Sequence, residues 1–471
     1  MIIGRVKEKN ELMAAYASEY SEFVAIYGRR RIGKTFLVRE TFDYRFTFEH
    51  SGLAESNLRT QLRAFRDSLV EAGMAKCKIP ETWMDAFALL RQLIKQSGDK
   101  KKTVFIDEVP WMDTPRSGFV SALEFFWNSF CAARRDVLLI ICGSATSWIT
   151  NKVLRNHGGL HNRVTYRLPL QPFTLHECEL FMQSRHINLS RYDLLELYMV
   201  MGGVPFYWSM VNRGESVAQC VDRLVFAPDG KLAGEFNELY DSLFKTPDDY
   251  IDVVVTLGNN GGGMTRQQLV NACHMDGNGK TTRILDDLQQ CGFIKRVTSA
   301  GLKNQAVFLL IDNFTLFYLK FVRANNVGDP DFWTHSYLSA THNAWTGLAF
   351  ERVCFQHVQQ IKQALGIAGV RTNVYTWRTG PAAGHRGAQI DMLIDRADNM
   401  VNICEMKFSK QDYVLERDEA MSLANKAERF LEGPGRGKSL NITLVTVNGL
   451  KHTGYWSNIH QVVTANDLFK E

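Results

Sequence analysis

The stretch Gly28-Arg-Arg-Arg-Ile-Gly-Lys-Thr35 decides how the first part of this sequence folds. It follows the pattern G-x-x-x-x-G-K-T, in which two glycines let the backbone turn tightly and point its N–H groups at an anion. The apolar residues 23–27 before it read as a buried strand, and residues 36–40 after it continue as a helix with a partly positive N-terminus. The sequence therefore predicts a phosphate-binding loop. Its residues are Gly28, Arg29, Arg30, Arg31, Ile32, Gly33, Lys34 and Thr35.

Four side chains in and beyond this loop have predicted chemical roles. Lys34 would reach the β- and γ-phosphates of ATP, and the Thr35 hydroxyl would ligate Mg²⁺. A second apolar strand, Thr103-Val-Phe-Ile-Asp107, ends in adjacent carboxylates, at the place where open α/β sheets bind their ligands. We expect Asp107 to hold Mg²⁺, directly or through water, and Glu108 to polarise the attacking water. The alternative is a strand followed by an acidic turn.

A third apolar run, Val137-Leu-Leu-Ile-Ile-Cys142, is predicted to be a strand that leads to Ser144. Ser144 is a candidate for the polar group that senses the γ-phosphate, with a simple turn as the alternative. Arg163 could reach the phosphates of its own nucleotide or of a neighbouring subunit's nucleotide, or be a solvated arginine. His157 and His161 have no third metal ligand beside them, so we expect ordinary polar residues.

The composition of this 471-residue chain is that of a soluble globular protein with several domains. Its net charge of +5 permits a nucleic-acid partner without requiring one. The nine cysteines form no C-x-x-C pair, a pattern typical of a reducing compartment. The first residues lack a signal-peptide core, and the longest apolar run is too short to span a membrane. We therefore expect a cytoplasmic protein without a membrane partner.

Changes in pattern along the chain predict four segments: an ATPase core at 1–170, a helical lid at 171–244, a winged helix at 245–328 and an α/β domain at 329–471. Capping boxes open helices in the second and third segments. Three helical patterns and two strands predict the winged helix, which either contacts DNA phosphates or binds another protein. Its basic candidates for DNA contact are Lys280, Arg283, Lys295, Arg296 and Lys303.

The last segment contains a spaced set of acidic and basic residues. Asp391 lies on one predicted strand, and Glu405 and Lys407 lie in phase on the next, so that a turn near residues 398–399 would bring all three together. This D-x(n)-E-x-K spacing is that of the restriction-endonuclease fold. The two carboxylates could hold Mg²⁺ or Mn²⁺, with Glu351 as an additional ligand, while Lys407 orients or deprotonates water. The alternative is a surface hairpin with ordinary charges.

Several of these motifs occur together in one known family. The chain resembles the archaeal-type ATPases of the AAA-like, STAND-related group, which join a P-loop ATPase to a winged helix and a C-terminal domain with an endonuclease-like core. The resemblance covers essentially the whole chain and implies ATP binding and a role linked to DNA or to signalling. The matching stretches are Ile3-Gly-Arg5 with Glu8, 28–35, Phe105-Ile-Asp-Glu108, Cys142-Gly-Ser144, Gly202-Gly-Val-Pro205, Gly387-Ala-Gln-Ile-Asp391 and Cys404-Glu-Met-Lys407.

The resulting prediction is an α/β protein with an AAA-like P-loop core, a helical lid, a winged helix and a restriction-endonuclease-like domain. It would bind and hydrolyse ATP, and its nucleotide state would control a metal-dependent, nuclease-like domain that acts on DNA. Two alternatives stay open: a STAND-type switch whose C-terminal domain is an inactive interaction module, and a DNA-binding regulator. A homo-oligomer or a partner protein also stays open.

Overall fold

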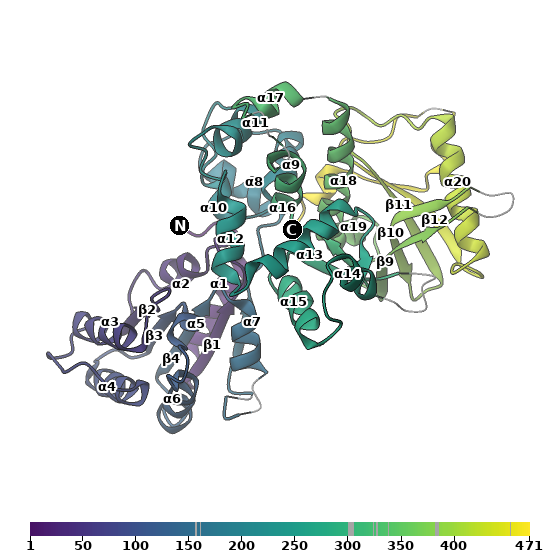
Figure 1. Cartoon of the computed structure of the whole chain (residues 1–471). Coiled ribbons are helices and arrows are strands. Elements are labelled where there is room, and N and C mark those ends of the chain that lie inside the picture. The colour runs from purple at the N-terminus through teal and green to yellow at the C-terminus, as the bar shows by residue number, and fades with distance from the viewer. Residues whose placement is uncertain are drawn as a thin grey trace. The chain divides into compact units, whose positions relative to one another are not determined.

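The computed structural model describes residues 1–155, 158–160, 162–299, 306–323, 325, 328–337, 339–381, 386–452 and 454–471. The chain divides into two compact units, Met1–Gln171 and Pro172–Glu471 (Figure 1). His157, His161 and Lys303, named above as candidates, lie outside the described residues.

The first unit is built on a five-stranded sheet in which every paired strand is parallel. The strands lie in the order β2-β3-β4-β1-β5, so β4 separates the strand before the glycine-rich loop from the strand that ends in Asp107. The strands are β1 (Glu22–Tyr27), β2 (Phe48–Ser51), β3 (Lys102–Asp107), β4 (Val137–Gly143) and β5 (Tyr166–Pro169).

Both faces of this sheet are covered by helices, which explains why its strands read as unbroken apolar runs. In β1, Phe23 and Ala25 belong to one hydrophobic cluster, while Val24 and Ile26 belong to the cluster on the other face. The helices are α1 (Val6–Ala17), α2 (Lys34–Thr41), α3 (Leu58–Glu71), α4 (Trp83–Gln96), α5 (Val109–Met112), α6 (Phe119–Phe126) with η1 (Trp127–Cys131), and α7 (Thr146–Ile149) with η2 (Thr150–Leu154).

The second unit begins with helices that pack around α9. Every residue of α9 from Leu194 to Met201 is buried, so the predicted lid segment contributes its middle helix to the core of this unit. Capping boxes at Thr174 and Ser190 fix the starts of the first two helices. The helices are α8 (Leu175–Ser184), α9 (Arg191–Met201), α10 (Pro205–Trp208), α11 (Val217–Val221), η3 (Asp222–Phe226) and α12 (Glu235–Leu243).

A helix, a short strand, two helices and a hairpin come next. The hairpin strands pair antiparallel, and the short strand pairs with the outer one. These elements are α13 (Pro247–Asn259), β6 (Met264–Thr265), α14 (Arg266–Ala272), α15 (Gly279–Gln290), β7 (Ile294–Ser299) and β8 (Ala306–Leu310). They are followed by α16 (Asn313–Phe317), η4 (Tyr318–Val322) and α17 (Phe332–Ser336).

The rest of the second unit is a mixed sheet between helices. Strands β9, β10 and β11 are antiparallel neighbours, whereas β12 runs parallel to β11 and β13 parallel to β12. Helix α18 packs with one face and α20 with the other (Figure 1). The elements are α18 (Ala340–Gln356), α19 (Val358–Ala364), β9 (Thr372–Thr379), β10 (Ala388–Arg396), β11 (Met400–Lys407), α20 (Arg417–Glu432), β12 (Ser439–Thr446), η5 (Trp456–Asn458), β13 (Gln461–Val463) and α21 (Ala465–Leu468).

One backbone connection joins the hairpin to this sheet. Strand β7 pairs in parallel with β9 through Thr298 opposite Tyr375 and Ser299 opposite Thr376. The result is one eight-stranded sheet in the order β13-β12-β11-β10-β9-β7-β8-β6. The hairpin and the strands that carry Asp391 and Glu405 are therefore parts of the same sheet.

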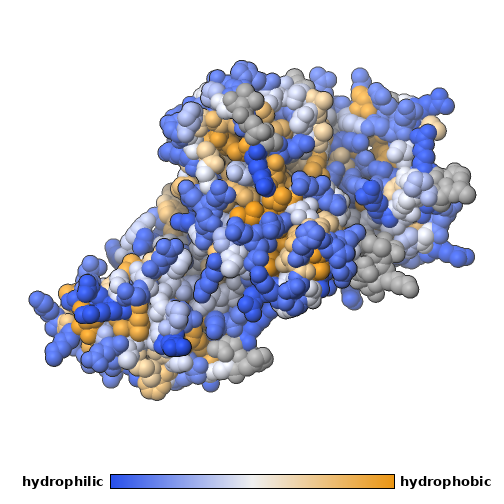
Figure 2. Space-filling view, in the orientation of Figure 1, coloured by the Kyte–Doolittle hydropathy of each residue, from blue (hydrophilic) through white to orange (hydrophobic). Residues whose placement is uncertain are grey.

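Hydrophilic residues cover most of the face of the protein shown in Figure 2, with apolar patches between them. Within the described part of the chain, every helix is too short or too polar to span a bilayer.

Candidate functional site

The glycine-rich loop between β1 and α2 has a backbone that only its glycines can adopt easily. Gly28 has a φ of 149°, and a Cβ atom there would lie 2.3 Å from the carbonyl oxygen of Leu170. Gly33 has a φ of 85° and caps α2, which begins at Lys34. Arg31 also has a positive φ, of 68°. These turns place the loop against the N-terminus of α2, as a phosphate cradle requires.

The side chains of the loop differ in exposure. Ile32 and Arg29 are buried, with 1% and 3% of their surface exposed, whereas Arg30 is exposed to solvent. Lys34 is 5% exposed, and its ammonium group donates to the carbonyl oxygens of Gly28 (2.8 Å) and Arg29 (2.9 Å) and to Ser144 Oγ (3.1 Å). The Lys34 side chain therefore lies over the glycine-rich loop, on the side where a phosphate would bind.

The predicted Mg²⁺ ligands lie together at the edge of the sheet. Thr35 Oγ1 donates to Asp107 Oδ2 at 2.5 Å, and the backbone N–H of Glu108 donates to Asp107 Oδ1 at 2.8 Å. A hydroxyl and a carboxylate are oxygen ligands of the kind Mg²⁺ prefers, and Mg²⁺ usually completes its shell with phosphates and water. Among the described residues of either unit, no three His, Cys, Asp or Glu side chains are grouped to hold a metal ion by themselves.

Glu108 and Ser144 form a hydrogen-bonded pair across neighbouring strand ends. Ser144 donates to the two carboxylate oxygens of Glu108, from its backbone N–H at 3.1 Å and from its Oγ at 2.7 Å. Glu108 has a positive φ of 46° and caps α5, which turns its side chain back over the sheet. Since Ser144 Oγ also accepts from Lys34, one serine connects the phosphate-binding lysine with the candidate base.

Arg5 supports the glycine-rich loop through hydrogen bonds that the sequence alone did not predict. Its side chain is buried and donates to the carbonyl oxygens of Ile32 (3.4 Å) and Gln171 (2.6 Å), while it approaches Glu8 at 3.7 Å. The sequence feature that could have indicated this role is the Ile3-Gly-Arg5 motif, which was quoted above only as part of the family resemblance. Arg163 is exposed, and within the described residues no hydrogen bond or ion pair ties its side chain to the loop.

The second unit gathers Glu351, Asp391 and Glu405 into a carboxylate cluster. Strands β10 and β11 pair with Met392 opposite Cys404, so Asp391 and Glu405 follow as the next facing positions. Against β9 the register of β10 shifts between Ile390 and Leu393, an irregularity of the kind that turns a side chain out of the regular pattern. Burial, followed by the charge of Glu405, raises the pKa of Asp391.

Glu351 on α18 extends this cluster. Burial, followed by the nearby Asp391 carboxyl group, raises the pKa of Glu351 from 4.5 to about 8. Two buried carboxyl groups without a cation between them repel each other, and one of them keeps a proton. The next residue, Arg352, is 4% exposed and donates to the carbonyl oxygen of Gly261.

Two lysines and a second glutamate surround Glu405. Lys426 Nζ on α20 lies 2.7 Å from Glu405 Oε2, and Lys407 Nζ lies 3.3 Å from both Glu405 Oε1 and Glu419 Oε1. Burial lowers the pKa of Lys407, but the two carboxylates outweigh burial, so its pKa is raised overall. Sequence reasoning missed Lys426 and Glu419. The sequence feature that could have indicated them is their spacing of seven residues, which places both side chains on one face of α20.

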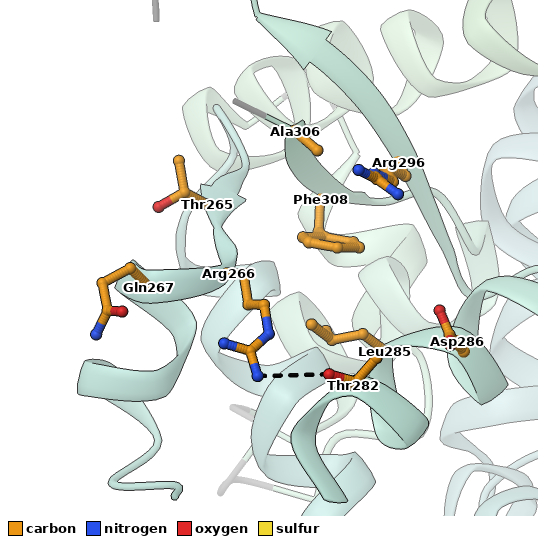
Figure 3. Close-up of a pocket in the computed structure, with 9 residues that line it drawn as sticks. All are labelled: Thr265, Arg266, Gln267, Thr282, Leu285, Asp286, Arg296, Ala306 and Phe308. Atoms are coloured by element: carbon orange, nitrogen blue, oxygen red, sulfur yellow. Dashed lines mark hydrogen bonds between the residues drawn. The ribbon is translucent and has the colours of Figure 1, made fainter. Parts of the chain in front are cut away.

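The hairpin region corrects one predicted DNA contact. Lys295 Nζ donates to the carbonyl oxygen of Phe355 at 3.0 Å, and burial lowers its pKa, so this lysine faces the core rather than a ligand. Lys280 forms an ion pair with Asp249 at 2.8 Å. Arg296 is exposed and lines a cavity of about 440 Å³ together with Arg266 (Figure 3).

Comparison with known proteins agrees with the geometry of the first unit. Residues 3–211 match the sequence profile of an ATPase domain found predominantly in Archaea. This part of the chain is therefore similar to an archaeal-type P-loop ATPase domain, in line with its motifs. A protein of Methanocaldococcus jannaschii, described as uncharacterized, is 24% identical over 399 residues, which are 83% of this chain and 84% of that one.

A solved structure has a similar fold. A Walker-type ATPase of Pyrococcus abyssi superposes with a TM-score of 0.51 and 15% identity, covering 68% of this chain and 96% of its own. The ORC2 protein of Aeropyrum pernix in its ADPNP–ADP complexes is less similar, with a TM-score of 0.41 and 15% identity over 68% of this chain and 93% of its own.

Proposed function

We propose that the first unit hydrolyses ATP with Glu108 as the general base. The observation that carries this proposal is the continuous network Lys34–Ser144–Glu108, beside the 2.5 Å hydrogen bond from Thr35 to Asp107. These contacts support the proposal because they hold Lys34, Thr35, Asp107 and Glu108 at the same sheet edge, where one would bind phosphate, two would hold Mg²⁺ and one would act as the base. Bound Mg²⁺ would supply charge neutralisation on the phosphates.

Each protein group has one task in this reaction. The loop N–H groups and Lys34 bind the β- and γ-phosphates, and Thr35 and Asp107 hold Mg²⁺. Glu108 accepts a proton from water as the water oxygen bonds to the γ-phosphorus, and the bond from the γ-phosphorus to the β–γ bridging oxygen breaks to leave ADP. Ser144 holds the Glu108 carboxylate until the γ-phosphate offers Lys34 and Ser144 another partner.

In the second unit we propose a metal-dependent, nuclease-like site that acts on DNA. The order α18, β9, β10, β11, α20, β12 supports a restriction-endonuclease-like core, with Asp391, Glu405 and Lys407 on its two central strands. Burial and then the Asp391 carboxyl group raise the pKa of Glu351, and burial and then Glu405 raise the pKa of Asp391, so a divalent cation at these carboxylates would remove an unfavourable interaction. Lys407 would orient or deprotonate the attacking water.

The elements from α13 to β8 have the order of a winged helix, and we propose that they support this DNA-acting site. Arg266 and Arg296 are the basic side chains of the cavity in Figure 3, where Arg266 also donates to Gly277 at 2.9 Å. Because Lys295 is half-buried and bonded to the Phe355 carbonyl oxygen and Lys280 is paired with Asp249, phosphate contact on this face depends on few charges. A weak dependence of DNA affinity on salt concentration is therefore expected.

The test of the nuclease proposal uses plasmid and linear DNA with the full-length protein and Mn²⁺. Asp391→Ala should abolish cleavage and leave ATP hydrolysis unchanged, while Asp418→Ala, an exposed position on α20, serves as the matched control. Addition of ATP to wild type and to Glu108→Gln tests control by nucleotide state, because only wild type can turn ATP over. Equal cleavage with and without nucleotide would contradict that control.

A second candidate function is an ATP-driven switch whose C-terminal region binds a partner without cutting DNA. The observation in its favour is that Lys426 and Lys407 already neutralise Glu405 at 2.7 and 3.3 Å. A cluster satisfied by its own lysines needs no metal to be stable. Absence of cleavage on any DNA with Mg²⁺ or Mn²⁺, combined with ATP-dependent partner binding, would favour this candidate.

A further inference from the structure

A second cavity of the second unit, of about 190 Å³, opens beside the carboxylate cluster. One wall is the glycine loop Gly261–Gly263 that leads into β6, and the other walls come from α18, β9 and β10. Glu351 and Asp391 line one part of it and Arg378 on β9 lines another. The cavity therefore presents carboxylates and a guanidinium group to the same small space.

Two arginines of this cavity have side-chain donors that the protein itself does not pair. The Arg378 side chain is exposed to water and makes no hydrogen bond or ion pair within the described residues. Only 4% of the surface of Arg352 is exposed, and its Nε atom has no hydrogen-bond partner in the described part of the structure. Buried polar atoms without partners cost stability, so they point to a ligand with acceptor oxygens.

We propose that this cavity binds one phosphate of a single DNA strand and delivers that strand to the carboxylate cluster. Arg378 contacts the phosphate oxygens, and a divalent cation on Glu351 and Asp391 contacts the same phosphate from the other side. This proposal rests on the nuclease-like function proposed above. Arginine suits the role because its planar guanidinium group matches two phosphate oxygens.

The size of the cavity selects a single strand. A space of about 190 Å³ is smaller than ordinary ligand pockets of about 300–1,000 Å³, so it accepts one phosphate with part of its sugar. A duplex, whose major groove alone is about 12 Å wide, cannot enter between the glycine loop and β9. A strand end or an unpaired segment can.

The glycine loop keeps this space open. A Cβ atom built on Gly262 would lie 3.8 Å from Arg378 Nη1, an ordinary contact that the backbone tolerates. A larger side chain at Gly262 would extend toward Arg378 and fill the cavity. Gly262→Leu is therefore a blocking variant, and Gly369→Leu is its control, because a Cβ atom at Gly369 meets nothing within 4 Å.

The experiment measures binding of a fluorescein-labelled oligothymidine to the full-length protein by anisotropy, in Ca²⁺ so that binding is separated from cleavage. Arg378→Gln should weaken binding about tenfold to a hundredfold, the loss expected for one hydrogen bond to a charged group. Gly262→Leu should weaken it at least as much. Arg371→Gln, an exposed arginine before the other end of β9, and Gly369→Leu should bind like wild type.

Each outcome separates this proposal from the proposed function. Unchanged binding by Arg378→Gln and Gly262→Leu overturns the cavity assignment, even if wild type cuts DNA with Mn²⁺. If wild type binds the oligothymidine and both variants lose that binding, the result supports the cavity as the strand-binding site, even if no cleavage occurs and the nuclease function fails. A duplex of the same sequence that binds as tightly as the single strand, or an oligouridine RNA that binds more tightly, overturns the assignment to single-stranded DNA.

Discussion

Replacing Glu108 by glutamine should separate ATP binding from ATP hydrolysis. In the structure the Glu108 carboxylate accepts two hydrogen bonds from Ser144, at 3.1 and 2.7 Å, and makes no contact with the glycine-rich loop itself among the hydrogen bonds described. Glutamine keeps the size of the side chain but cannot take a proton from water. The loop, Lys34 and the Thr35–Asp107 pair stay as they are, so nucleotide affinity should be nearly unchanged.

The size of the effect follows from the role of a general base. Loss of general base catalysis reduces rates by about 10²–10⁴, which corresponds to about 2.7–5.4 kcal/mol in the activation free energy. Ser144→Ala keeps the carboxylate and the backbone N–H contact but removes the 2.7 Å hydrogen bond. One hydrogen bond to a charged group contributes about 1.5–3 kcal/mol, so we expect turnover to fall by roughly ten to a hundredfold.

Phosphate release in a coupled assay measures turnover, and calorimetric titration with ATP measures affinity. Glu71→Gln, an exposed position at the end of α3, is the control for loss of one carboxylate. Turnover in Glu108→Gln equal to that of wild type would refute the assignment of the base.

Three further predictions concern single residues. Lys34→Ala should weaken ATP binding by about 2–5 kcal/mol in calorimetry, since a buried charge contact to phosphate is lost, and unchanged affinity would contradict this role. Arg5→Ala should lower the free energy of unfolding by about 1–3 kcal/mol in urea, because the carbonyl groups of Ile32 and Gln171 lose their donor; a stability equal to wild type would mean that water replaces it. The pKa of Glu351 is raised from 4.5 to about 8, so the folded state holds a proton that the unfolded state releases, and stability should fall as pH rises through this window. Calorimetry of Glu351→Gln across the same pH range should show a smaller fall, and an identical pH profile would argue against the raised pKa.

The sequence was sufficient to predict the elements whose patterns are local. The strands ending in Tyr27 and Asp107 were predicted because both faces of the sheet are covered, which leaves nearly unbroken apolar runs. The antiparallel pairing of β10 with β11 followed from the two-residue period of strands and a turn of the right length. Confirmation of the ATPase domain rests on the same glycine-rich loop.

Features that depend on distant contacts were not predictable in this way. Lys295 reads as an exposed wing residue, but its partner is the carbonyl group of Phe355, sixty residues away. Lys426 reaches Glu405 only because α20 packs on the sheet. Strand β9 was missed because its burial alternates irregularly, so its pattern carries little strand signal. Arg378 at its end was missed with it.

The two residue pairs that join β7 to β9 decide which truncated forms of the protein can be expressed in a folded state. A fragment starting at residue 329 would lack β7 and would leave β9 with a row of unpaired N–H and C=O groups. Such open edges recruit strands from other molecules, so this fragment should aggregate during expression. A fragment spanning 172–471 is the whole second unit, so it keeps this pairing and all eight strands with their covering helices.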